Sequence, residues 1–67
     1  MSILKVIELM ASSEISWEDA LRNAVKTAGK TVKAIRSAYV QDQSAVVKDN
    51  DVIEFRVNVK ITFEIIR

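Results

Sequence analysis

An unbroken alternation of apolar and polar residues runs from position 53 to position 65 and constrains the fold more than any other feature. Alternation with a period of two is typical of a β-strand with one buried face. A strand of this length extends about 43 Å at roughly 3.3 Å per residue, whereas a compact 67-residue globule is about 28 Å across. The strand therefore either bends around the rest of the domain or has its ends covered by neighbouring subunits. Its apolar members are Ile53, Phe55, Val57, Val59, Ile61, Phe63 and Ile65.

A helix is predicted from about Trp17 to Ile35. Ser16 offers a hydroxyl acceptor to the free amides at its start, and Glu18 and Asp19 place carboxylates beside the positive end of the helix dipole. The apolar residues that follow recur at spacings of three and four, as in a helix with one buried stripe. They are Trp17, Ala20, Leu21, Ala24, Val25, Ala28, Val32 and Ile35. Gly29 lies off this stripe. We expect the helix to continue through it, although glycine lowers helix stability by roughly 1 kcal/mol relative to alanine.

Three strands accompany the helix. Residues 3–10 predict the first strand, residues 37–47 the second, and residues 48–51 a turn that joins the second strand to the long alternating one. A right-handed crossover makes the first two strands parallel, and the third then fits between them. The sequence therefore predicts an α+β fold of the type β-α-β-β, in which a three-stranded sheet of order 1-3-2 wraps around one helix. The sheet face that the helix does not cover and both edges of the sheet are then available for contacts with symmetric partners.

The composition favours assembly over independent stability. The chain is predicted to form one domain, residues 1–67, and a domain this small buries only about 60% of its unfolded surface. It has no cysteine and no histidine. Disulfides, thiolate or imidazole metal sites, and nucleophilic or acid/base catalysis by these residues are therefore excluded. Oligomerisation is the remaining means of stabilisation, and a self-contained enzyme is not expected.

Charged residues suggest neither a nucleic-acid site nor a metal site. Basic residues at helical spacing complement the helix dipole, and the net charge is only +1; they are Arg22, Lys26, Lys30 and Lys33. Asp49, Asn50 and Asp51 are interpreted as turn residues, with a cation site as the alternative. No segment has the roughly 20 apolar residues that cross a bilayer, and charges interrupt the apolar run near the N-terminus. We expect a cytoplasmic protein with no membrane partner.

Several short segments stand in a characteristic order along the chain: Lys5-Val6-Ile7-Glu8, Ser16-Trp17-Glu18-Asp19-Ala20, Lys30-Thr31 and the long alternating strand. Their order and spacing resemble the dodecin family over nearly the whole chain. The resemblance implies a hollow homododecamer that binds flavins, FMN or riboflavin, between its subunits, and that stores or buffers them without catalysis.

The positions that match the family's flavin pocket are changed in this chain. In flavin-binding dodecins a tryptophan after the helix stacks on the flavin ring and a glutamine in the third strand binds its polar edge. By the resemblance, Ser37 and Arg56 take these positions. Loss of an aromatic platform removes roughly 0.5–1.5 kcal/mol beyond its buried area, so we expect weakened flavin affinity. Arg56 could instead stack on a ring or bind an anionic group.

Two aromatic residues have alternative roles. Tyr39 lies two positions beyond Ser37 on the same strand face, so it either lines the same cavity or packs ordinarily. Trp17 either replaces the lost platform or, as its place on the helical stripe favours, packs in the core or an interface. The leading prediction is a shell that binds a small, flavin-type ligand at Ser37, Tyr39 and Arg56. The alternative is a flavin-free assembly that holds a metal ion or another anionic metabolite.

Overall fold

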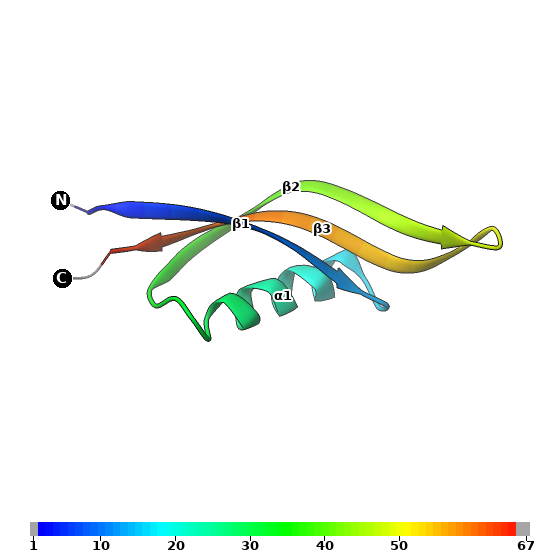
Figure 1. Cartoon of the computed structure of the whole chain (residues 1–67), viewed down its shortest axis with the longest axis horizontal. Helices are drawn as coiled ribbons and strands as arrows, with labels where there is room; N and C mark the ends of the chain where they lie inside the picture. The colour runs from blue at the N-terminus through cyan, green and yellow to red at the C-terminus, as the bar shows by residue number, and fades with distance from the viewer. Residues whose placement is uncertain (1, 66–67) are drawn as a thin grey trace.

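The computed structural model describes residues 2–65 and contains one helix and three strands in this part of the chain. The order is β1 (Leu4–Ser13), α1 (Trp17–Ala28), β2 (Ile35–Lys48) and β3 (Asp51–Glu64). The sheet order is β1-β3-β2, and β3 is antiparallel to both neighbours. The predicted β-α-β-β topology and the order 1-3-2 are therefore confirmed. α1 lies along one face of the sheet, and the β2–β3 hairpin extends beyond it (Figure 1).

The core forms where α1 meets the middle of β3. Three alanines face the sheet from α1, and three branched side chains face the helix from β3. The short alanine side chains let the helix approach closely, so the aliphatic groups of β3 become almost completely inaccessible to water. The six residues are Ala20, Ala24, Ala28, Val57, Val59 and Ile61. These three β3 residues are successive members of the predicted apolar set and alternate residues of the strand, as strand geometry requires.

The start of α1 is fixed by two serines. The Ser16 hydroxyl accepts a hydrogen bond from the amide of Asp19 at 3.0 Å, so the predicted N-cap is confirmed. The buried Ser13 hydroxyl donates to the Asp19 carboxylate at 2.6 Å and accepts from the amide of Ile15 at 2.9 Å. This network satisfies the buried Ser13 hydroxyl. β1 continues to Ser13, three residues beyond the predicted end of the first strand, because its pairing with β3 extends to Phe55.

The predicted continuation of the helix to Ile35 is wrong. α1 ends at Ala28, and Gly29 is its C-cap, with its amide donating to the carbonyl of Val25 at 2.9 Å. The chain then turns tightly and reaches β2 through Ala34, whose φ is 60°. Val32 and Ile35 still pack against the core, but from the connecting loop and from the first residue of β2.

The hairpin turn is tighter than predicted. Only Asp49 and Asn50 lie between the strands, with φ values of 52° and 65°. Positive φ at both central residues is the geometry of two-residue hairpins whose twist matches that of the flanking strands. β3 consequently begins at Asp51, two residues before the predicted alternation.

The molecule is elongated. Its extents are 51 × 19 × 13 Å and its radius of gyration is 13.7 Å, whereas about 11 Å is expected for a compact chain of this length. Irregular register along β2, at Ile35/Ser37, Val40/Asp42 and Val46/Val47, accompanies the curvature of the hairpin (Figure 1). The long strand thus overshoots the core, as its sequence predicted. Within residues 2–65 there is no helix of the length and apolarity that a bilayer crossing needs.

Candidate functional site

The sheet face opposite α1 carries all three residues that the sequence proposes for ligand binding. β3 turns Val57, Val59 and Ile61 toward the helix, so the residues between them point to the other side. We call this side the open face. Directly paired residues of neighbouring strands share a face. Ser37 pairs with Thr62, Tyr39 with Lys60, and Arg56 with both Ser12 and Ser44, which places the three candidates on the open face.

Ser37 and Tyr39 are close neighbours there. They are two residues apart on β2, and the Tyr39 side chain is well exposed, with 65% of the residue accessible. Lys60 and Thr62 accompany them on β3. These residues combine an aromatic surface, three hydroxyls and a cation, which suits a flat ring that carries polar or anionic substituents.

Arg56 does not join this pair within one subunit. Arg56 lies four residues along β3 from Lys60, the cross-strand partner of Tyr39, a separation of roughly 13 Å. The Arg56 Nε donates to the Glu54 carboxylate at 3.2 Å, and both side chains remain partly accessible. A pocket that contains both Ser37 and Arg56 would therefore have to combine residues of two subunits.

Trp17 is engaged in packing. Its ring meets Phe55 edge to face, with centroids 4.9 Å apart and planes at 73°. Its indole N–H donates to the carbonyl of Ser44 at 2.9 Å, which ties the start of α1 to β2. The packing interpretation of Trp17 is thereby supported, and Tyr39 is left as the aromatic side chain of the open face.

An apolar strip along β1 was not recognised from the sequence. Leu4, Val6 and Met10 pair with Glu64, Thr62 and Asn58, so they lie on the open face, and each is more than half exposed. Ile7 and Leu9 point to the helix and pack against the core. The signal was present in the first strand, because apolar residues at both odd and even positions are typical of a strand covered on both faces.

Carboxylates and basic residues do not form a compact site in the subunit. Among residues 2–65, no group of three potential metal-binding side chains converges. Asp49 and Asn50 form the hairpin turn, as predicted. Of the basic helical residues, Arg22 is paired with Glu18 at 3.0 Å, one turn earlier in α1.

Comparison with known proteins agrees with this architecture. The dodecin family model matches residues 3–65. A protein of Mycobacterium tuberculosis, calcium dodecin, is 36% identical over 64 residues, which cover 96% of this chain and 90% of that protein. Its crystal structure, described as having a novel calcium-binding site, has a TM-score of 0.84 at 34% identity and is covered to 91%, against 96% of this chain.

Dodecin structures of lower sequence identity show the same fold. A variant of the Thermus thermophilus dodecin has a TM-score of 0.94 at 24% identity, with 100% of both chains covered. Dodecin from Streptomyces coelicolor has a TM-score of 0.93 at 24% identity, with 98% of this chain and 94% of that chain covered.

Proposed function

The chain belongs to the dodecin family, and we propose on that basis that it is a subunit of a hollow homododecamer that binds a small ligand between subunits. The proposed role is storage or buffering of that ligand in the cytoplasm, without catalysis. Family membership supports the type of assembly, and the open face provides the surface on which subunits and ligand would meet.

The observation that carries this proposal is the exposure of the apolar strip on β1. Leu4, Val6 and Met10 lie along the sheet face that α1 does not cover, with Glu8 between Val6 and Met10, and Met10 is 69% exposed. Burial of apolar surface contributes roughly 25 cal/mol per Å², so a second subunit on this face gains stability. The polar residues between this strip and Tyr39 would then border the covered surface.

A flavin-type ligand fits the region of Ser37 and Tyr39. The Tyr39 ring would provide the stacking surface that serine at position 37 lacks, and Lys60 beside it favours an anionic substituent such as the phosphate of FMN. One tyrosine in place of a tryptophan platform gives a smaller contact area, so we expect modest affinity.

A second candidate is a flavin-free shell that holds calcium. It is favoured by the 36% identity with calcium dodecin, and by Ser37 at the position where flavin-binding members stack the ring. Calcium takes six to eight oxygen ligands. Open-face carboxylates such as Glu8 and Asp42 would have to be gathered from several subunits around a symmetry axis.

Riboflavin and calcium titrations distinguish the two candidates. If the ring stacks on Tyr39, the wild type will quench riboflavin fluorescence, Tyr39→Phe will retain the quenching and Tyr39→Ala will lose it. Both variants leave the buried core untouched, and phenylalanine keeps the aromatic surface. Calorimetric calcium binding without any flavin quenching would overturn the flavin proposal in favour of the second candidate. Absence of binding in both titrations would overturn ligand binding at this face.

A further inference from the structure

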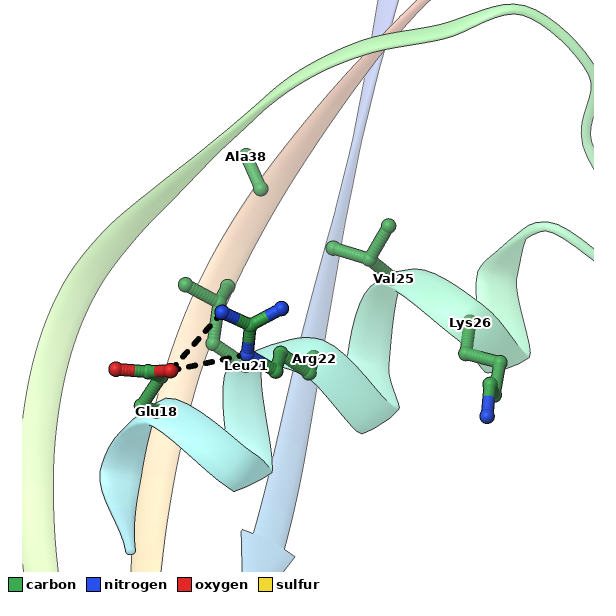
Figure 2. Close-up of a pocket in the computed structure, with 6 residues that line it drawn as sticks. All are labelled: Glu18, Leu21, Arg22, Val25, Lys26 and Ala38. Atoms are coloured by element: carbon green, nitrogen blue, oxygen red, sulfur yellow. Dashed lines mark hydrogen bonds and ion pairs between the residues drawn. The ribbon is translucent and has the colours of Figure 1, made fainter.

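A groove runs between α1 and β2 on the helix side of the sheet. Its apolar floor is made by Leu21 and Val25 of α1 and by Ala38 of β2, and its volume is about 580 Å³. Figure 2 shows Leu21 and Val25 on the side of α1 that faces Ala38, with the Glu18–Arg22 ion pair beside them along the helix. The groove exists because α1 packs mainly against β1 and β3 and only lightly against β2.

At the far end of the β2–β3 hairpin, apolar side chains project without a surface of the same chain to pack against. β1 pairs with β3 only as far as Phe55, so the hairpin continues past it as two strands alone. Val47 and Val52 are direct cross-strand partners and are 61% and 53% exposed. A two-stranded ribbon is marginally stable in water unless another surface covers it.

The hairpin of one chain does not reach the groove of the same chain. Along β2, Ala38 and the last residue, Lys48, are ten residues apart, a distance of roughly 33 Å. Figure 1 shows the hairpin tip projecting past the end of α1 along the long axis of the molecule. A hairpin that occupies this groove must therefore belong to another molecule.

Charges at the two surfaces are complementary. The groove rim carries Glu18, Arg22 and Lys26, a net charge of +1. The hairpin tip carries Lys48, Asp49 and Asp51, a net charge of −1. Complementary charges favour correct docking and disfavour other pairings.

From these observations we propose that the tip of the β2–β3 hairpin of one copy docks into the α1/β2 groove of a second copy. The apolar pair Val47 and Val52 covers the floor of the groove, and the acidic turn lies against Arg22 and Lys26. The contact joins two different surfaces, so copies related by a rotation that closes would form a ring, the form that a closed assembly requires. This inference rests on the proposed assembly and specifies one of its interfaces.

A charge-exchange experiment tests the contact. The hairpin variant Asp49→Asn/Asp51→Lys changes the tip from −1 to +2, and asparagine tolerates the positive φ at position 49. The rim variant Arg22→Gln/Lys26→Glu changes the rim from +1 to −2. We expect each variant alone to raise the protein concentration at which the assembly dissociates at least tenfold, measured by light scattering on dilution. Combining both variants restores opposite charges and should return this concentration to within about threefold of wild type.

A matched control changes the same number of charges elsewhere. Lys30→Glu/Lys33→Gln also lowers the charge by three, at exposed positions that line neither the groove nor the hairpin, and should leave the dissociation concentration unchanged. A misfolded hairpin would not be rescued by the rim variant, so the combined protein separates loss of docking from loss of folding. If neither variant weakens the assembly, or if combining them does not restore it, the hairpin contact is overturned and the proposed assembly is not. A wild type that stays monomeric overturns the proposed assembly together with the hairpin contact.

Discussion

In the middle of β3, side chains point alternately toward α1 and toward the open face, so a residue's position in this alternation decides whether its side chain is buried under the helix. Val57, Val59 and Ile61 are buried under α1, whereas Arg56 and Lys60 between and beside them face away from the helix. This division was predictable, because alternation with a period of two leaves a strand only one way to bury its apolar side. The same rule placed Ser37 and Tyr39 on one face of β2. It could not show that Arg56 lies far from both, since that depends on strand register.

Ser37→Trp tests whether the expected weak affinity for flavin results from the absence of a stacking tryptophan at this position. Tryptophan at this position would stand beside Tyr39 on the open face, and symmetry would supply a second copy across the subunit interface. Two platforms at roughly 1 kcal/mol or more each should tighten riboflavin binding at least tenfold, since 1.4 kcal/mol is one decade. Fluorescence quenching measures the gain.

Arg56→Gln, alone and combined with Ser37→Trp, completes this series. An amide can both donate to and accept from the edge of a flavin ring, so the double variant should bind most tightly, with most of the gain from Ser37→Trp. Arg56 is distant from Ser37 within the subunit, and its own contribution therefore reports a pocket shared between subunits. Wild-type protein that already binds as tightly as the double variant would show that these positions do not form the pocket.

Element boundaries depend on features that residue patterns do not record. The apolar spacing seen in the sequence continues through Val32 and Ile35 although these residues are not helical. They lie in the connecting turn and at the start of β2, and both still pack against the core. α1 nevertheless ends at Ala28, and Ala34 redirects the chain with φ of 60°. Gly29, the C-cap, is the one sequence signal for this end of the helix, because glycine is common just after a last helical turn. The left-handed conformation of Ala34 costs roughly 1–2 kcal/mol and has no sequence signature, so the path of the chain into β2 could not be predicted.

Asn50 should be replaceable by glycine but not by a β-branched residue. Its φ of 65° in the hairpin turn suits glycine without steric cost, whereas isoleucine would strain the backbone. We expect Asn50→Ile to lower the free energy of unfolding by about 1–2 kcal/mol and Asn50→Gly to leave it within about 0.5 kcal/mol, from urea unfolding at fixed protein concentration. Equal stability of the two variants would contradict the turn geometry.

The shape of the whole molecule leaves surfaces that a single subunit cannot cover. The core contains six small or medium-sized residues, while the 51 Å length carries the hairpin beyond it. The apolar strip on β1, the uncovered hairpin tip and the α1/β2 groove are separate surfaces. Several distinct contact surfaces on one small chain are consistent with a closed assembly of high symmetry and exceed what a simple dimer would cover.

Light scattering of the purified protein at micromolar concentration tests the proposed assembly most directly. Twelve copies of a 7.5 kDa chain have a mass of roughly 90 kDa, and a closed shell should give this mass without growing further as concentration rises. A single species near this value is the predicted result. A stable monomer or dimer in the same range would contradict assembly through the open face, and with it a ligand site between subunits.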